Sequence, residues 1–217
     1  MHSSLTVIIK PTNECNLSCK YCCVEKTAER GRMTSATLEK ATQQIMTLPG
    51  RDRIRWIWHG GEPALMGVDF FEEAVKLQSR YQNRHLLRNG IQTNATLLSE
   101  SLLEFLLDNH FVITSSIDGP EEINNLTRTY PDGRGAFKDA WRAIERIREK
   151  TKETSIDGSN GASRIGIICV LSRKNIAKID QVYQFFRENN LSVKMNPLIP
   201  AGKAVDDLTG LSLPDTF

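Results

Sequence analysis

Six short apolar runs alternate with longer amphipathic stretches along this chain, and this alternation limits the fold more than any other feature. Strand-like runs cover 5–10, 54–59, 87–93, 111–117, 165–171 and 192–198, and helical stretches lie near 35–48, 69–83, 99–109, 137–149 and 176–189. Strict strand–helix alternation indicates βαβ units and a parallel sheet. The pattern fits a partial (β/α)6 barrel, and a flat doubly wound sheet is the alternative.

Two of the helical stretches have a clear apolar stripe, which predicts their buried faces. The stripes are Phe137, Trp141, Ile144 and Ile147 in one helix, and Ile176, Ile179, Val182, Tyr183 and Phe186 in the other. Thr34 precedes the first helix and Asn175 the fifth, as start signals do. The Gly- and Ser-containing segment 150–163 predicts an exposed loop.

Composition indicates an ordinary globular protein of 217 residues. The net charge is +2, from 28 basic minus 26 acidic residues, which is too balanced to indicate a nucleic-acid partner or a polybasic membrane anchor. No apolar run approaches the roughly 20 residues that span a bilayer. We expect a core domain over 1–200, with 201–217 as a tail or the truncated start of a linker. Unpaired thiols and the absence of a signal peptide predict a cytoplasmic location.

A loop directly after the first strand carries Cys15, Cys19 and Cys22 in a C-x3-C-x2-C spacing. Three thiolates on one short loop can hold three irons of a cubane [4Fe–4S] cluster and leave the fourth iron without a protein ligand. Clusters that only carry electrons normally take four cysteines. The spacing therefore predicts a cluster whose open iron binds a small molecule.

Other roles fit these cysteines less well. A structural zinc site takes four ligands, usually in two separated pairs. The only remote cysteine is Cys169, and no histidine pair has a ligand spacing. Cys23 directly follows Cys22, and adjacent thiols do not easily bind one cluster with good geometry. We interpret Cys23 as a small packing residue or an alternative ligand.

Chemically suitable residues also follow the second and third strands. In parallel α/β folds, ligands gather beyond the carboxyl ends of the strands. Gly60 and Gly61 let the backbone approach a ligand closely, and Glu62 offers an acceptor for an ammonium group. Asn94 offers a donor and an acceptor for ribose hydroxyls, or it only turns the chain toward the next helix.

The fourth strand ends near Ser116, and Arg128 lies on the segment that follows. A hydroxyl beside a guanidinium is a reasonable carboxylate site. Taken singly, each feature has a simpler interpretation, since 118–120 can be only a turn and Arg128 only a surface charge.

Together these motifs resemble the radical S-adenosylmethionine (radical SAM) superfamily, and more narrowly its anaerobic sulfatase-maturase branch and related peptide-modifying enzymes. The segments that carry the resemblance are the cysteine loop with an aromatic residue before its last cysteine, HGGEPALMGVDFF at 59–71, IQTNATLL at 91–98, SIDGPEEINNLTR at 116–128, and Gly-Ala-Phe at 135–137. The resemblance covers residue 5 to about residue 200, and it implies the partial barrel.

The resemblance also implies a cofactor and its contacts. In the family, the open iron chelates the amino and carboxylate groups of S-adenosylmethionine, and reductive cleavage yields a 5′-deoxyadenosyl radical. The expected contacts are Gly60, Gly61 and Glu62 at the amino group, Asn94 at the ribose, Ser116 and Arg128 at the carboxylate, and Tyr21 and Met195 beside the adenine. No residue is identifiable as the base that deprotonates the substrate.

The sequence departs from the family pattern in three places. Ala95 replaces the glycine usual after Gln-Thr-Asn, and 123–125 reads Ile-Asn-Asn where Ile-His-Asp is common. The relatives also carry a C-terminal cysteine-rich domain, called SPASM, with auxiliary clusters, whereas no cysteine follows Cys169 here. We therefore expect the substrate-handling half to be missing.

The function expected from the sequence is that of a radical SAM enzyme, or its core domain, acting on a peptide or protein side chain. An external donor of the flavodoxin or ferredoxin type would supply the electron. A radical SAM enzyme for a small metabolite and a non-catalytic iron–sulfur or zinc module are the alternatives.

Overall fold

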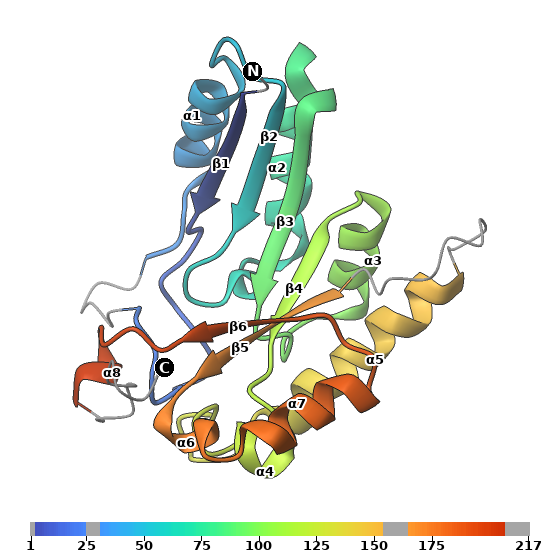
Figure 1. The fold of residues 1–217 in the computed structure, drawn as a ribbon. Helices are drawn as coiled ribbons and strands as arrows, with labels where there is room; N and C mark the ends of the chain where they lie inside the picture. Colours follow the sequence, from blue (N-terminus) through green and yellow to red (C-terminus); the bar gives the residue numbers. More distant parts are fainter. Residues whose placement is uncertain (1–2, 25–30, 154–164, 207–217) are drawn as a thin grey trace. The chain divides into compact units, whose positions relative to one another are not determined.

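The computed structural model describes residues 3–24, 31–153 and 165–206 (Figure 1). Its strands are β1 (Ser4–Ile9), β2 (Arg53–Trp58), β3 (Leu87–Thr93), β4 (Val112–Ser116), β5 (Ile165–Leu171) and β6 (Val193–Pro197). They form one sheet in the order β1-β2-β3-β4-β5-β6. A doubly wound sheet has a non-sequential order because the winding direction reverses. The sequential order therefore excludes that alternative and confirms the partial (β/α)6 barrel.

Five long helices separate the strands, as the periodicity predicts. They are α1 (Ser35–Met46), α2 (Gly67–Ser79), α3 (Glu100–Asp108), α5 (Phe137–Glu153) and α7 (Ile179–Glu188). The shorter helices are η1 (Pro63–Met66), η2 (Gln82–Leu86), α4 (Glu121–Asn124), α6 (Arg173–Ile176) and α8 (Lys203–Asp206). The sequence did not predict these short helices, because about one turn contains too few residues to show a period of 3.6. No helix in the described ranges is both long and apolar enough to span a membrane.

The chain divides into two compact units. The first unit comprises Met1–Glu14, Lys26–Thr93 and Leu97–Ile113, and the second comprises Cys15–Glu25, Asn94–Thr96 and Thr114–Phe217. The cysteine loop therefore belongs to the second unit.

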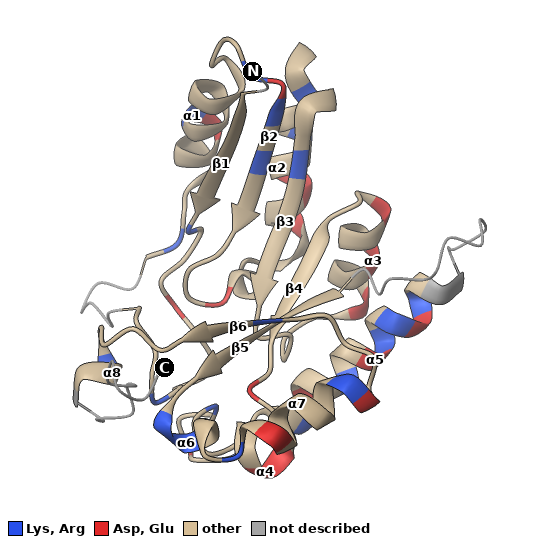
Figure 2. Cartoon of the chain, viewed as in Figure 1, with Lys and Arg blue, Asp and Glu red and all other residues tan. Residues whose placement is uncertain are grey.

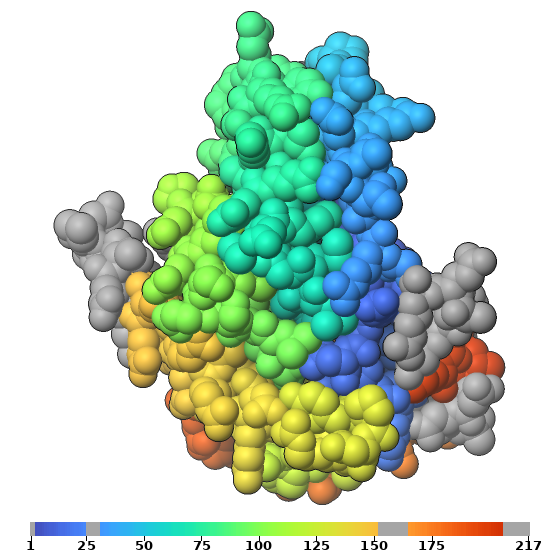
Figure 3. Space-filling model, turned by 180° about the vertical axis from the view of Figure 1, so that it is seen from behind, coloured from blue at the N-terminus to red at the C-terminus, as the bar shows by residue number. Residues whose placement is uncertain are grey.

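In the first unit, parallel strands β1, β2 and β3 pack one face against helices. Trp56 and Trp58 are fully buried on this face. The Trp58 ring contacts Phe70 and Phe71 of α2 edge-on, with centroid distances of 5.6 and 5.7 Å. Seen from behind, the surface of this unit consists largely of helical side chains (Figure 3).

The other face of these strands carries basic residues, because side chains alternate along a strand. Arg53, Arg55 and Arg88 are exposed there, and Arg55 and Arg88 are register partners on β2 and β3. Figure 2 shows the resulting blue segments along both strands. These arginines are among the 28 basic residues that nearly balance the 26 acidic residues of the whole chain.

In the second unit, α5 and α7 provide the apolar stripes that the sequence predicts, with one correction. Ile144 and Ile147 of α5 and Val182 and Phe186 of α7 are buried. Tyr183, which we expected in the buried stripe, is 60% exposed. Tyr183 lies about 100° around the helix from the buried Val182, whereas Phe185 lies on the side of α7 that packs against α5.

Phe185 takes the place predicted for Tyr183. Its ring lies 5.9 Å from that of Phe137 and 5.3 Å from that of Trp141. The two rings of α5 stack on each other at 5.5 Å. This aromatic cluster packs α5 and α7 together.

Helix boundaries differ from prediction in two places. The predicted helix over 176–189 is two helices, α6 and α7, and the N-cap of α6 is Ser172, with Asn175 closing a capping box from within the helix. Helix α5 continues to Glu153, although a loop was expected from residue 150. The rest of that predicted loop, from 154 onward, lies outside the described residues. The expected start at Thr34 is confirmed, since its side chain accepts a hydrogen bond from Thr37 N.

Candidate functional site

The cysteine loop follows β1 and is held by backbone hydrogen bonds to the segment that precedes α5. Ser18 N donates to Thr129 O at 2.7 Å, and Lys20 N donates to Thr127 O at 2.9 Å. Within the loop, Cys22 N donates to Cys19 O at 3.2 Å. Main-chain hydrogen bonds therefore tie this loop to the segment 127–129.

The three predicted ligand cysteines lie on this loop, and none of these residues is fully buried. Cys15 is exposed, and Cys19 and Cys22 are half-buried. Burial raises the pKa of the Cys19 thiol, although the Arg128 guanidinium acts in the opposite direction. No three Cys, His, Asp or Glu side chains within the described ranges already form a metal site. These residues suit an iron–sulfur cluster because three thiols lie on one loop whose backbone is hydrogen-bonded to a neighbouring segment.

Polar hydrogens also surround Cys15. Leu17 N lies 3.4 Å and Asn94 Nδ2 lies 3.8 Å from Cys15 Sγ. The Asn94 amide also donates to Asn16 Oδ1 at 2.9 Å, and Thr96 Oγ1 donates to Asn94 Oδ1 at 2.8 Å. Hydrogen bonds to cluster sulfurs tune iron–sulfur sites. Asn94 thus lies beside the first cysteine of the loop, and its predicted contact with a ribose stays a prediction.

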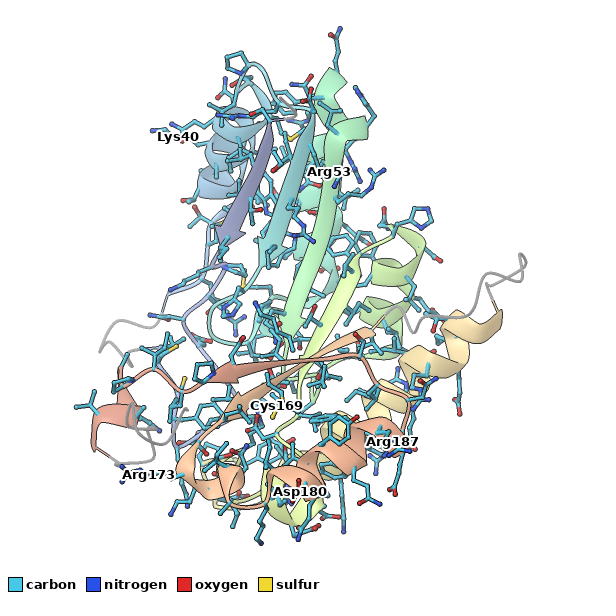
Figure 4. All side chains as sticks on the ribbon, in the orientation of Figure 1. Lys40, Arg53, Cys169, Arg173, Asp180 and Arg187 are labelled. Atoms are coloured by element: carbon cyan, nitrogen blue, oxygen red, sulfur yellow. The ribbon has the colours of Figure 1, made fainter. Side chains whose placement is uncertain are left out.

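The remaining cysteines lie in different surroundings. Cys23 is exposed at the end of the loop. Cys169, labelled in Figure 4, lies on β5 and has no exposed surface. Burial, followed by the nearby Asp118 carboxylate, raises the pKa of the Cys169 thiol far above its usual range. Cys169 is therefore a core residue.

Tyr21 and Arg128 meet at a carboxylate that the sequence did not single out. Asp118 Oδ2 accepts hydrogen bonds from Tyr21 Oη at 2.5 Å, Arg128 Nε at 3.0 Å and Thr127 Oγ1 at 3.2 Å. Asp118 Oδ1 accepts a fourth, from Val170 N at 2.9 Å. The segment 118–120 was interpreted as a turn. The one available signal was an acidic residue directly after a strand, in a run that ends with an arginine.

Arg128 is a buried cation rather than the surface charge of the simpler interpretation. Its side chain is 9% exposed, and its guanidinium carbon lies 5.3 Å from the centroid of the Tyr21 ring. Burial acts to lower the pKa of Arg128, but the Asp118 carboxylate, together with Tyr21 and Cys19, outweighs burial and raises that pKa. In the described ranges, Nε has a side-chain partner and neither Nη group has one.

Two other predicted contact residues belong to the same unit. Ser116 is half-buried at the end of β4, and Met195 is half-buried on β6, where it is the register partner of Cys169. Tyr21 is buried against Leu198 and Ala204. The roles of Ser116 at the carboxylate and of Tyr21 and Met195 beside an adenine stay predictions.

The segment after β6 packs on the cysteine loop. Lys203 N donates to Cys22 O at 3.1 Å, and Lys203 Nζ donates to Ser18 Oγ at 2.9 Å. At Gly202, with φ of +59°, a Cβ would lie 2.6 Å from Cys22 O. Residues 202–203 therefore contact the loop directly, inside the range predicted as a tail.

The Gly-Gly-Glu-Pro motif lies in the first unit, after β2. Gly61 N donates to Thr12 O at 3.0 Å, and a Cβ at Gly61 would lie 2.0 Å from Glu14 O. Glu62 is 1% exposed, and its Oε1 accepts from Ala64 N at 2.9 Å and Thr93 Oγ1 at 2.6 Å. The motif therefore fixes the backbone just before Cys15, and the predicted contacts of Gly60, Gly61 and Glu62 with an ammonium group stay predictions.

Comparison with known proteins decides the family. The model of the radical SAM superfamily matches residues 9–185. The chain belongs to the radical SAM superfamily. Members of this enzyme family use a [4Fe–4S] cluster and S-adenosylmethionine (AdoMet) for radical chemistry.

The similar proteins include anaerobic sulfatase-maturating enzymes. The chain is 31% identical over 194 residues to a cysteine-type enzyme of Clostridium perfringens, covering 86% of this chain and 49% of that protein. It is 30% identical over 152 residues to a serine-type enzyme of Bacteroides thetaiotaomicron, covering 67% of this chain and 37% of that protein. The chain thus spans about half the length of the first of these relatives.

The solved structure of native anSMEcpe with bound AdoMet and the Cp18Cys peptide has a TM-score of 0.77. Its sequence is 30% identical to this one, and the matched region covers 91% of this chain and 52% of that chain. Streptococcus suis SuiB, solved with its precursor peptide SuiA, has a TM-score of 0.62 at 18% identity, which supports the fold alone.

Proposed function

We propose that this radical SAM chain binds a [4Fe–4S] cluster and AdoMet to modify a peptide or protein side chain. The observation that carries the proposal is Arg128. A guanidinium whose side chain is only 9% exposed and whose Nη groups have no side-chain partner in the described ranges is suited to a carboxylate ligand. It lies in the same compact unit as the cysteine loop.

The thiolates of Cys15, Cys19 and Cys22 would hold the cluster. When bound, the cluster and AdoMet supply one electron and a primary carbon radical that abstracts a hydrogen atom. Asn94 Nδ2, at 3.8 Å from Cys15 Sγ, stabilises negative charge on that sulfur. Hydrogen bonds from Ser18 N and Lys20 N to Thr129 O and Thr127 O hold the backbone of the loop that carries these thiolates.

The chain's remaining residues would orient AdoMet. Arg128 with Ser116 receives the carboxylate, Glu62 accepts from the ammonium, and the glycines at 60 and 61 leave room for the backbone to approach it. Glu62 Oε1 already accepts two hydrogen bonds, which hold the carboxylate in one orientation. Tyr21 and Met195 border the adenine, and Asn94 contacts the ribose.

The substrate proposal rests on relatives. The 31% identical protein is named a cysteine-type anaerobic sulfatase-maturating enzyme, and the anSMEcpe structure contains a peptide. These relatives support a peptide substrate. An external flavodoxin- or ferredoxin-type electron donor and a cytoplasmic location complete the proposal. Nucleic acid and membrane are not among the proposed partners.

The first test is AdoMet binding after anaerobic reconstitution of the cluster. Arg128→Gln should weaken binding by about 1.5–3 kcal/mol, the usual worth of a charge-assisted hydrogen bond, or roughly ten- to a hundredfold. The matched control is Arg134→Gln, since Arg134 is 57% exposed and pairs with Asp139. Equal affinities in wild type and Arg128→Gln would show that Arg128 does not bind the cofactor.

The second test is product analysis by mass spectrometry under dithionite. We expect these 217 residues to form 5′-deoxyadenosine slowly without modifying added peptides, because substrate positioning supplies much of the rate in such chemistry. Rapid peptide-dependent turnover would contradict this expectation. No 5′-deoxyadenosine from a fully loaded cluster would favour the non-catalytic alternative.

A further inference from the structure

Asp118 is a buried carboxylate of the second unit that accepts four hydrogen bonds. It is 1% exposed. Three side chains donate to its Oδ2, namely Tyr21, Thr127 and Arg128, and Val170 N donates to its Oδ1. One carboxylate thus joins the cysteine loop, the segment after α4, and β5.

The backbone of Asp118 is fixed as well. Asp118 N donates to Asn124 Oδ1 at 3.1 Å, and Asn175 Nδ2 donates to Asp118 O at 3.4 Å. Gly119 follows with φ of +134°, and a Cβ there would lie 3.0 Å from a methyl carbon of Val182. The carboxylate therefore has little freedom to move relative to its partners.

Arg128 depends on this carboxylate for both charge and direction. A buried guanidinium without a counter-charge is costly, and Asp118 is its ion-pair partner at 3.0 Å. Because the pair forms through Nε, the edge of the rigid guanidinium that lies between its two Nη groups is directed away from Asp118. Tyr21 donates to the same oxygen and places its ring against the guanidinium.

We infer that Asp118 is a positioning residue, which aims Arg128 at the AdoMet carboxylate. This inference rests on the proposed function, since it requires Arg128 to bind the cofactor. Asp118 itself touches neither reacting atoms nor cluster ligands in this assignment. Its effect on the cofactor passes through Arg128.

The test is a double-mutant cycle on AdoMet affinity in the anaerobically reconstituted protein. The variants are Asp118→Asn, Arg128→Gln and the double variant, and AdoMet is titrated against the EPR signal of the reduced cluster. We expect Asp118→Asn to weaken binding roughly tenfold, and the double variant to bind no more weakly than Arg128→Gln. A merely structural role would make the two losses multiply, which would overturn the inference.

Thr127→Val gives a milder version of the same test if Asp118→Asn does not fold. Thr127 donates to Asp118 Oδ2 at 3.2 Å, so its loss should weaken AdoMet binding by roughly two- to tenfold, and only while Arg128 is present. Thr129→Val is the matched control, two residues along the same segment. Equal effects of Thr127→Val with and without Arg128 would overturn the inference.

The cycle separates this inference from the proposed function. If Arg128→Gln leaves AdoMet affinity unchanged in a protein with a full iron content, both fail. If Arg128→Gln weakens binding while Asp118→Asn and Thr127→Val do not, the proposed function stands and the positioning role of Asp118 is refuted.

Discussion

Replacing Gly61 by alanine tests whether the Gly-Gly-Glu-Pro motif needs its glycine for backbone contact. A Cβ at Gly61 would lie 2.0 Å from Glu14 O, 2.6 Å from Glu14 C and 2.8 Å from Asn13 C. All three are backbone atoms, so no side-chain rotation can relieve the overlap. The segment 12–14 has to move away from the motif by more than an ångström.

Two hydrogen bonds set the size of the effect. Gly61 N donates to Thr12 O at 3.0 Å, and Glu62 N donates to Glu14 O at 2.7 Å. Losing both costs about 1–3 kcal/mol at about 0.5–1.5 kcal/mol each. For a chain of this size, each kcal/mol lowers the melting temperature by about 2–4 °C. We therefore expect Gly61→Ala to melt about 2–12 °C below wild type.

The assay is thermal unfolding of the metal-free protein, followed by iron analysis after reconstitution. Glu14 directly precedes Cys15 in the chain, so displacement of Glu14 should also lower iron loading. The matched control is Gly31→Ala, because a Cβ at Gly31 meets nothing within 4 Å. Equal melting temperatures for Gly61→Ala and wild type would refute the close approach of these two backbone segments.

Three further predictions test the cysteines, a backbone conformation and a surface ion pair. Cys15→Ala should abolish [4Fe–4S] loading in iron analysis and EPR, whereas Cys169→Ala should keep it, because Cys169 is a buried core residue. Ala95 has φ of +63° and is buried, so in Ala95→Gly the relief of about 1–2 kcal/mol of left-handed strain offsets the entropic cost of glycine of about 0.5–1 kcal/mol. Thermal unfolding should therefore show no loss of stability for Ala95→Gly, and a loss of about 1 kcal/mol for Ala74→Gly in the middle of α2. Hydrogen bonds from Arg134 and Tyr130 lower the pKa of Asp139 in the folded protein. The Asp139 carboxylate therefore stabilises the fold fully above its unfolded pKa of about 3.9, and this stabilisation is lost as pH falls through the lower folded pKa. Urea titrations should accordingly separate Asp139→Asn from wild type at pH 7 and not at pH 2.

The sequence by itself determined the order of the elements and the cysteine loop. Apolar periodicity is a local property, so the six strands and five long helices emerged within a few residues of their observed bounds. The cysteine spacing is local too, and one short loop carries all three thiols. Glycines in the Gly-Gly-Glu-Pro motif predicted a close approach to a ligand, which stays a prediction, whereas the structure shows Gly61 close to the backbone of Glu14.

Tertiary structure decided which polar residues are buried and what they bind. Arg128 and a surface arginine look alike in sequence, and only packing makes its side chain 9% exposed. Asp118 was indistinguishable from a turn residue, because its partners Tyr21 and Val170 are 97 and 52 positions away in the chain. Packing against α5 likewise decided that Phe185, and not Tyr183, contacts Phe137 and Trp141. Local patterns predict elements, whereas long-range contacts decide which charges are buried together.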